Sequence, residues 1–478
     1  MRPVNKIKKS TLAFSTTILC CGLFLLLTVT TSFAASPVNS AWQGPVQVSN
    51  DDTWTSPNAQ IVINEHGDGI ATWQQYTLLD NTYGIWVARF NKEHGWSTPE
   101  KISGNTVGQV GNPPSVAINE HGDAVVAWPV FNINSSPMST VWSSYFDHKK
   151  GWSAPVKIQS DAVDAYSPLV TIDERGNAIA IWSQNNPEYD RTNIYANYYH
   201  KNHGWGHSAM IQSDARVLSV DIAIVNNHEG NTVAMWSQFD SNPDNPQTGL
   251  VTRSYIKDKG WTSPEFVTRE DALSPSIAIN KNGKSIVAWG SLNPDTNQYN
   301  VKVNMRRGNS TWGDSQLIQS DPTIDAQAIK AAINERGDAL VLWRGSTYVY
   351  FGTAPIDMYS NVYDEKSGWS TEQKVSDTAP YSVPQLALDE NGNAIAVWEK
   401  TTTGPNPYVD FHDIYAFYYS PDKGWYNSQS IETFDGDSTY PQLSMTESGD
   451  TLAIWEQSSN IGGATLWSNY YRSRHRRH

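Results

Sequence analysis

The stretch that decides the fold is Ala117-Ile118-Asn119-Glu120-His121-Gly122-Asp123-Ala124-Val125-Val126-Ala127-Trp128. It begins as a short alternating strand, passes through a tight polar turn that contains glycine, and ends as a second strand closed by tryptophan. Related stretches recur every 53 to 57 residues, and in each a glycine precedes the closing tryptophan by six positions. The repeated tryptophans are Trp73, Trp128, Trp182, Trp236, Trp289, Trp343, Trp398 and Trp455. Eight matches indicate an internal repeat.

A second signature runs in phase with the first. A Gly-Trp pair or a close variant recurs once per repeat and opens a further short strand. Its tryptophans are Trp96, Trp152, Trp205, Trp261, Trp312, Trp369 and Trp425, and Trp42 stands 54 residues before the first of them. The N-terminal region therefore carries the last strand of a repeat whose other strands lie at the C-terminus.

Each repeat is predicted to form four short strands, which we name A to D. Strand A resembles Ser276–Asn280, strand B resembles Ala178–Trp182, strand C resembles Ile194–Tyr199, and strand D follows Gly-Trp. Eight four-stranded units of about 54 residues are typical of a β-propeller. We predict an all-β, eight-bladed β-propeller of antiparallel blades over residues 35–478, with the last blade closed by the N-terminal strand.

Residues 1–34 have the pattern of a signal peptide. Lys6, Lys8 and Lys9 precede an uncharged run, and Ser32-Phe33-Ala34 resembles a cleavage site. We expect cleavage before Ala35, although the run is long enough to serve as an anchor if it is retained. Both cysteines lie in this segment, so the mature chain would contain none. The expected location is periplasmic, cell-surface or extracellular.

The charge balance argues against nucleic acid as a partner. The chain has 34 basic and 48 acidic residues, and removal of residues 1–34 would make the net charge of −14 more negative. The basic run Arg472–His478 is typical of a solvated tail. No second apolar run is long enough to span a membrane, so we expect no span after cleavage, and we expect a monomer.

The repeated tryptophans are predicted to pack in the core, because aromatic residues that recur in register usually fill space between neighbouring sheets. The Asn/Asp-Glu-x-Gly turn is too short for a twelve-residue calcium loop and favours a solvated hairpin. No group of His, Cys or Asp has the spacing of metal ligands, and no nucleophile elbow or phosphate loop is present. We therefore expect no metal and no cofactor.

The candidate site lies on the face formed by the B–C and D–A loops, because these loops differ between repeats whereas the A–B and C–D turns are nearly uniform. The D–A loops are rich in acidic and aromatic residues. The predicted ligand-binding residues are Trp54, Asp164, Tyr166, Arg344, Asp377, Tyr381, Asp437 and Tyr440. For any single residue the alternative is structural, with Asp capping the loop and Tyr packing beneath it.

The element Gly392-Asn393-Ala394-Ile395-Ala396-Val397-Trp398, followed by Gly424-Trp425, resembles the repeats of exported bacterial propeller proteins that are mostly uncharacterised. The resemblance extends from residue 41 to about residue 471 and implies the fold, but it supplies no catalytic residues. Asp-box sialidases and pyrroloquinoline-quinone dehydrogenases are similar in outline. Their Gly-to-Trp spacing differs from the one here, which argues against either activity.

Three functions remain open from the sequence. The favoured one is a non-catalytic exported propeller that binds a carbohydrate or protein through the B–C and D–A loops. The first alternative is a sialidase-like glycoside hydrolase that uses paired Asp residues of that face, which would need two carboxylates flanking a pocket. The second is a scaffold protein of the cell envelope. The sequence thus favours a binding protein over an enzyme.

Overall fold

The computed structural model describes residues 42–50, 53–55, 59–77, 82–104, 113–132, 134–227, 229–240, 247–308, 310–347, 356–376, 383–403, 410–433, 436–458 and 463–473. The chain divides into two compact units, residues 1–40 and 41–478, and every described residue belongs to the second. The predicted signal peptide therefore lies outside the described residues. The described residues form strands and turns, with no helix that could cross a bilayer.

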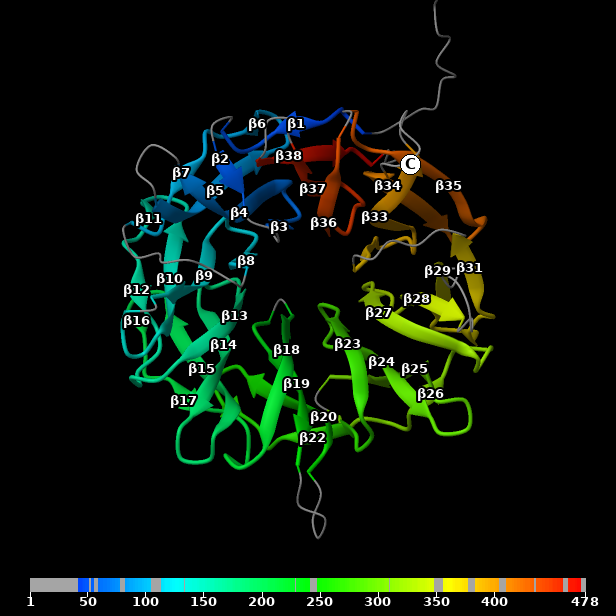
Figure 1. Ribbon diagram of the computed structural model, residues 1–478, viewed down its shortest axis with the longest axis horizontal. Coiled ribbons are helices and arrows are strands. Elements are labelled where there is room, and N and C mark those ends of the chain that lie inside the picture. Colours follow the sequence, from blue (N-terminus) through cyan, green and yellow to red (C-terminus); the bar gives the residue numbers. More distant parts are fainter. Residues whose placement is uncertain are drawn as a thin grey trace, which may run out of the picture. The chain divides into compact units, whose positions relative to one another are not determined.

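The second unit is an eight-bladed β-propeller, which confirms the predicted fold. Eight antiparallel sheets surround a common centre (Figure 1). Blade 1 contains β2 (Thr53–Thr55), β3 (Gln60–Ile63), β4 (Asp68–Thr77), β5 (Thr82–Asn91), β6 (Gly95–Trp96) and β7 (Glu100–Lys101). Blade 2 contains β8 (Ser115–Ile118), β9 (Ala124–Phe131), β10 (Ser139–Asp147), β11 (Gly151–Trp152) and β12 (Val156–Lys157). Blade 3 contains β13 (Ala165–Ile172), β14 (Ala178–Asn186), β15 (Arg191–His200), β16 (Gly204–Trp205) and β17 (Ala209–Met210).

The next three blades follow the same order from the inner strand to the outer ones. Blade 4 contains β18 (Leu218–Asn226), β19 (Thr232–Phe239), β20 (Gly249–Ile256), β21 (Gly260–Trp261) and β22 (Glu265–Thr268). Blade 5 contains β23 (Ala272–Ile279), β24 (Ser285–Asn293), β25 (Gln298–Arg306) and β26 (Gln316–Leu317). Blade 6 contains β27 (Ile324–Ile333), β28 (Ala339–Thr347), β29 (Ile356–Asp364), β30 (Gly368–Trp369) and β31 (Gln373–Ser376).

The ring closes as the sequence predicts. Blade 7 contains β32 (Gln385–Leu388), β33 (Ala394–Thr403), β34 (Asp410–Ser420) and β35 (Gly424–Ser430). Blade 8 contains β36 (Ser438–Met445), β37 (Thr451–Ser458), β38 (Ala464–Tyr471) and the N-terminal strand β1 (Val46–Gln47). Strand β1 pairs antiparallel with β38, and Trp42 forms a further bridge to Tyr471. This pairing covers an edge that would otherwise expose unpaired backbone groups.

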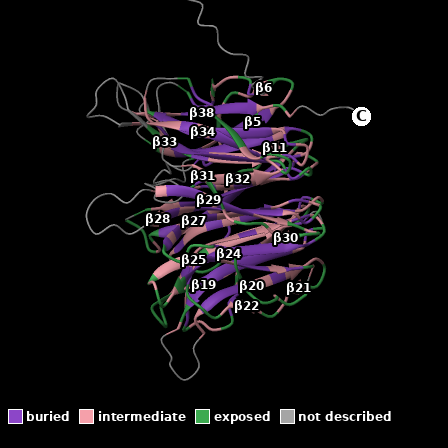
Figure 2. Ribbon diagram, turned by 90° about the vertical axis from the view of Figure 1, so that its right-hand side faces the viewer, coloured by how far each residue is buried: buried purple, intermediate pink, exposed green. Residues whose placement is uncertain are grey.

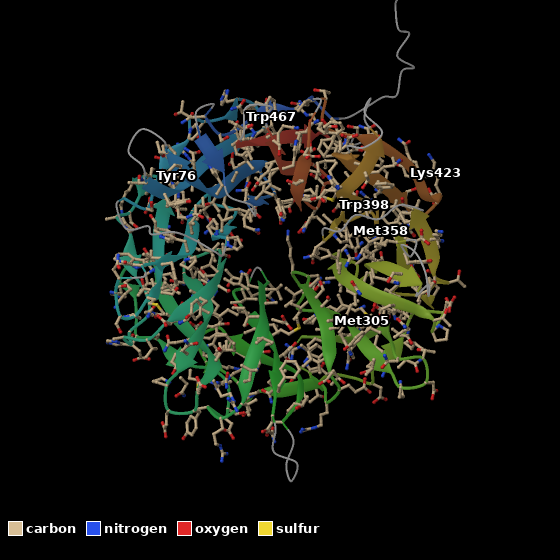
Figure 3. All side chains as sticks on the ribbon, in the orientation of Figure 1. Tyr76, Met305, Met358, Trp398, Lys423 and Trp467 are labelled. Atoms are coloured by element: carbon tan, nitrogen blue, oxygen red, sulfur yellow. The ribbon has the colours of Figure 1, made fainter. Side chains whose placement is uncertain are left out.

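The core lies between neighbouring blades. All eight strand-B tryptophans are fully buried, and side chains fill the space between the sheets (Figure 3). Trp182 of blade 3, for example, packs with Val125 and Tyr145 of blade 2. The Gly-Trp residues are half-buried and reach back to the preceding blade, as when Trp96 Nε1 donates to Ser468 Oγ at 2.6 Å. The prediction that these tryptophans are structural is confirmed.

The A–B turn, which is similar in sequence in most repeats, joins neighbouring blades. Asn119 Oδ1 accepts hydrogen bonds from His121 N at 3.1 Å and Asp123 N at 2.9 Å, which closes its own turn. Its Nδ2 then donates to Asp173 O of blade 3 at 3.0 Å. The adjacent Glu120 N donates to Glu174 Oε2 of the same neighbour at 3.1 Å. Related bonds recur between other blades, so this turn links the blades into a ring.

One turn departs from this pattern and crosses the ring. Lys281 occupies in blade 5 the position that Glu fills in most turns, and it forms an ion pair with Glu447 of blade 8. Blades 5 and 8 are not neighbours, so the pair must span the centre at the A–B end. Together with Glu335 and Glu65, Glu447 raises the pKa of the Lys281 ammonium.

Candidate functional site

The face formed by the B–C and D–A loops, hereafter the loop face, carries most of the large apolar side chains that are exposed among the described residues. Exposed residues gather in the turns and loops beyond the buried strands (Figure 2). The large apolar side chains exposed on this face are Met138, Tyr189, Phe239, Leu292, Val383 and Tyr440. The other four exposed ones are on outermost strands: Val46, Val156, Leu317 and Tyr426. Exposed apolar residues gathered on one face favour an interaction surface there.

A groove of about 520 Å³ crosses this face between blades 2 and 3. The side chains that line it combine carboxylates, amides, a guanidinium and an apolar rim. Six of them are Met138, Asp164, Asn185, Asn186, Asp190 and Arg191. Tyr189 stands in the same B–C loop and is 38% exposed. The walls therefore offer hydrogen-bond donors and acceptors beside apolar contact area.

Asp164 is a predicted site residue that lines the groove and also has a structural role. Its Oδ1 accepts a hydrogen bond from Ser139 N, at the start of β10, at 2.9 Å. The matching Asp325 accepts from Tyr299 N at 2.9 Å, and Asp437 accepts from His412 N at 3.1 Å. Each of these aspartates thus caps strand C of the preceding blade. Asp164 and Asp437 thus have the capping role that the structural alternative describes, and Asp164 also borders the groove.

Tyr166 lies beside Asp164 and Asn185, two residues that line the groove. Its side chain is half-buried, and burial together with the Asp164 carboxylate raises the pKa of its hydroxyl. Tyr440 is different, because it is 43% exposed and has a φ of 55°. Its backbone N–H donates to Glu399 Oε1 at 2.7 Å. Of these two predicted tyrosines, only Tyr440 presents its ring to solvent.

Of the remaining predicted residues, Arg344 and the backbone of Trp54 lie on other blades. Arg344 is half-buried on blade 6, where its guanidinium donates to Gln327 Oε1 at 2.6 Å. The backbone of Trp54 pairs with Tyr76 in β2 and β4 of blade 1. Asp377 and Tyr381 lie outside the described residues. Of the eight predicted residues, the structure thus brings Asp164 and Tyr166 together at blades 2 and 3.

The innermost strands contain a feature that the sequence reasoning missed. Strand A carries a β-bulge in several blades, and the residue in the bulge adopts positive φ although it is not glycine. These residues are Ser167, Asp221, Ser274, Ala328 and Tyr440, with φ between 50° and 55°. A proline follows Ser167, Ser274 and Tyr440, and this proline is the feature of the sequence that could have indicated the bulge. Bulges often re-aim side chains next to binding sites.

Two bulges border a second cavity, of about 480 Å³, on the same face. Its walls include inner-strand residues of four successive blades, so it lies at the centre of the ring. Six of them are Gln60, Ser115, Ser167, Leu169, Ser219 and Asp221. Thr192 lines both this central cavity and the groove, so the two adjoin. Burial raises the pKa of the Asp221 carboxyl.

In four blades a buried glutamine stands two positions after the strand-B tryptophan, and in three of them it accepts a hydrogen bond from that tryptophan; the four are Gln75, Gln184, Gln238 and Gln457. Trp73 Nε1 donates to Gln75 Oε1 at 2.9 Å, and Trp182 Nε1 donates to Gln184 Oε1 at 3.0 Å. Trp236 and Gln238 form the same pair at 3.2 Å. These glutamines are buried, so they hold the tryptophans in place. In blade 2 the corresponding residue is Val130, and Trp128 Nε1 is buried with no partner.

On the opposite face, one group of side chains within the described part of the chain has the geometry to hold a metal ion. Ligand atoms of Asp123, Asp147 and His148 lie within 4.8 Å of one another, which sequence spacing did not indicate. Asp123 already accepts hydrogen bonds from His148 N at 3.1 Å and Lys201 Nζ at 2.5 Å. These contacts lower the pKa of Asp123 against the effect of its burial. An ion would therefore have to displace the Lys201 ammonium.

A further cavity of about 450 Å³ lies on this opposite face between blades 1 and 2. Its lining includes His94, His121 and His148. Two of these belong to contacts between side chains, because His121 Nδ1 lies 3.5 Å from Glu174 and His148 Nδ1 lies 2.8 Å from Asp123. The cavity is thus bordered by the side chains that link turns and blades.

Comparison with known proteins gives similarity of fold only. No family model and no curated protein matches the chain. An ulvan lyase of polysaccharide lyase family 25, bound to -[GlcA(1-4)Rha3S]-, is 10% identical with a TM-score of 0.49, over 88% of this chain and 95% of that chain. The α-L-arabinanase of Penicillium chrysogenum complexed with arabinobiose is 13% identical with a TM-score of 0.40, over 89% and 98%. The intramolecular trans-sialidase of Ruminococcus gnavus is 10% identical with a TM-score of 0.37, over 76% and 95%.

Proposed function

We propose that this protein is an exported, non-catalytic propeller that binds a carbohydrate in the groove between blades 2 and 3. The observation that carries the proposal is the composition of that groove. Asp190, Asn185 and Arg191 offer acceptors and donors suited to sugar hydroxyls, while Met138 and Pro187 offer apolar area suited to the C–H faces of a sugar ring. The signal-peptide pattern of residues 1–34 supports export.

The exposure of the groove favours binding over catalysis. A general acid must be held protonated near neutral pH, which requires a carboxyl group shielded from water. Asp190 and Arg191 are exposed, and Asp164 is engaged by the backbone N–H of Ser139. Hydrogen bonding to hydroxyl groups requires no such shielding, so these side chains suit a binding site.

A glycoside hydrolase is the second candidate, and one observation favours it. Asp164 and Asp190 both border the groove, with the guanidinium of Arg191 beside them. Two carboxylates flanking one site are the minimum for glycoside hydrolysis. Release of reducing ends from any glycan that binds would separate this activity from binding alone.

The test is a glycan array followed by titration of the best ligand. We expect Met138→Ala and Asp190→Ala each to weaken binding by about tenfold or more, because each removes a side chain that lines the groove. Leu317→Ala is the matched control, since Leu317 is an exposed apolar residue on an outer strand and should leave affinity unchanged. Silence on every glycan, with a protein partner recovered by pull-down, would overturn the carbohydrate proposal. Equal losses in all three variants would show that the groove is not the site.

A further inference from the structure

Asp221 is a charged residue at a position of the inner strand where every other repeat has an uncharged one. It stands six residues before the first residue of its A–B turn, Asn227. The corresponding residues of the other repeats are Asn58, Pro113, Ser167, Ser274, Ala328, Val383 and Tyr440. Residues that depart from the repeat on the loop face are the ones expected to contact a ligand.

A β-bulge in β18 places Asp221 on the wall of the central cavity. The register between β18 and β19 shifts between Val220 and Ala223, and Asp221 within the bulge has a φ of 52°. Asp221 lines the cavity of about 480 Å³ together with Val220 and Ser219 of the same strand. Bulges re-aim side chains and are frequent next to binding sites, so this carboxyl group has a local backbone feature that directs it.

The Asp221 carboxyl is accessible to a ligand but has no counter-ion. The residue is exposed, yet the surrounding protein raises the pKa of its carboxyl by desolvation, and the Ser237 hydroxyl opposes that shift. A group on a concave wall is both reachable and partly desolvated in this way. Among the described residues, none forms an ion pair with Asp221. A cationic group in the cavity would therefore be stabilised there.

Ser219 is a second polar group of the same wall that lacks a partner. It is fully buried and lines the cavity. Within the described part of the chain, no group forms a hydrogen bond with its Oγ. A buried hydroxyl without a partner is costly, and a ligand hydroxyl group in the cavity would supply the missing bond. Ser167, Ser183 and Thr192 add further hydroxyl groups to the lining.

We propose that the central cavity binds a small hydroxylated amine, whose ammonium pairs with the Asp221 carboxylate and whose hydroxyl groups bond with Ser219 and its neighbours. Asp221 is the one charged residue among the described residues that line the cavity, so the wall offers a single negative charge that matches one ammonium. The cavity volume lies in the range of small-molecule sites. A bare metal ion would leave the apolar Pro168 and Leu169 without contact, whereas an amino sugar offers them its C–H groups.

This cavity is distinct from the groove on which the proposed function rests. Met138 and Asp190 line the groove and do not line the cavity, whereas Ser219 and Asp221 line the cavity and do not line the groove. Thr192 borders both, and no test variant changes it. The proposals can therefore fail independently, because each depends on its own substitutions.

The test is calorimetric titration of the purified protein with glucosamine and with N-acetylglucosamine. Glucosamine should bind at least about tenfold more tightly, because the amide of N-acetylglucosamine carries no charge to pair with Asp221. Asp221→Asn should remove this preference, and it should fold because asparagine tolerates positive φ. Asp422→Asn, at an exposed aspartate in the C–D turn of blade 7, is the matched control and should leave both affinities unchanged.

Ser219→Ala gives an independent measurement. It should weaken glucosamine binding by about threefold or more, because it removes the bond with a ligand hydroxyl. The free variant should have an unchanged or higher midpoint in urea denaturation, since the hydroxyl that it loses has no partner in the wild-type protein. Three results would overturn the proposal: equal affinity of glucosamine for Asp221→Asn and the wild-type protein, equal affinity of the wild-type protein for both sugars, or no binding of glucosamine at tens of millimolar.

Discussion

The two faces of this ring differ in how they use the same repeat. On the A–B face, Asn119, Glu120 and their counterparts form hydrogen bonds with the next blade, so variation there would break contacts that every blade needs. On the loop face, the turns differ between blades and carry exposed apolar side chains such as Met138 and Tyr189. The repeated residues are thus needed for packing, whereas a binding function would depend on residues that differ between the repeats.

The largest effect is expected from breaking one link of the A–B face. Asn119 is buried, and Asn119→Ala would leave two backbone N–H groups without their acceptor and would remove one of the two donors to the Asp173 carbonyl, which keeps Gly176 N. Each unsatisfied buried group costs about 1–3 kcal/mol, and partial hydration limits the total, so we expect a loss of about 2–4 kcal/mol. Urea denaturation of the variant measures it.

Asn132→Ala is the matched control on the opposite face of the same blade. Asn132 forms the same local bond, in which its Oδ1 accepts from Asn134 N at 3.0 Å, but it is exposed and contacts no other blade through its side chain. We expect a change within about 0.5 kcal/mol. Equal losses in Asn119→Ala and Asn132→Ala would contradict the distinction between the faces.

A smaller, pH-dependent effect is expected at Glu65, where the ring of turns joins blade 8 to blade 1. Its carboxylate accepts from Glu447 N at 2.9 and 3.0 Å, yet burial raises its pKa from the ordinary 4.5 to about 7, with Glu447 and Glu120 adding to the shift. The folded protein thus binds the Glu65 proton more tightly than the unfolded chain. This contribution to stability is full below pH 4.5 and is lost as pH rises through about 7.

Glu65→Gln keeps the acceptor oxygen and removes the charge. Relative to the wild-type protein, the variant should gain about 1–2 kcal/mol of stability between pH 5.5 and pH 8, as measured by urea denaturation across that range. Glu335→Gln is the control with the opposite sign. It removes one of the negative charges that raise the pKa of Lys281, so it should destabilise the protein at pH 8. A pH-independent difference between Glu65→Gln and wild type would refute the assignment.

The sequence predicts the fold well because packing repeats and repetition is visible. Every blade has a counterpart of Gly176 and of Trp182, and the spacing of these residues indicates the number of blades and the position of the turns. The Gly-Trp signature in turn indicates the closure by Trp42. The site is less visible, because an aspartate in a D–A loop can cap a strand or contact a ligand, and composition does not separate the two roles. Asp164 caps strand C of the preceding blade and also borders the groove.

The smallest effect is expected in blade 2, where the strand-B tryptophan lacks the hydrogen-bond acceptor that its counterparts in blades 1, 3 and 4 have. Val130 occupies in blade 2 the place of Gln75, Gln184 and Gln238, and it leaves Trp128 Nε1 buried without a partner. Val130→Gln would supply that acceptor, and the bond should contribute about 1 kcal/mol. Val130 also packs partly against the core, so we expect a net gain below about 1 kcal/mol in urea denaturation.

Val130→Asn separates the new bond from the loss of apolar contact. Its amide is polar but shorter by one methylene, so it should not reach Trp128 Nε1 and should be destabilising. Ultraviolet resonance Raman spectra of the indole N–H would detect the new bond in Val130→Gln directly. If Val130→Gln is no more stable than Val130→Asn and the indole signal does not change, the Gln–Trp bond forms only in blades whose other residues support it. In that case the variation between blades on the loop face extends inward to the strand-B tryptophans and does not stop at the exposed loops.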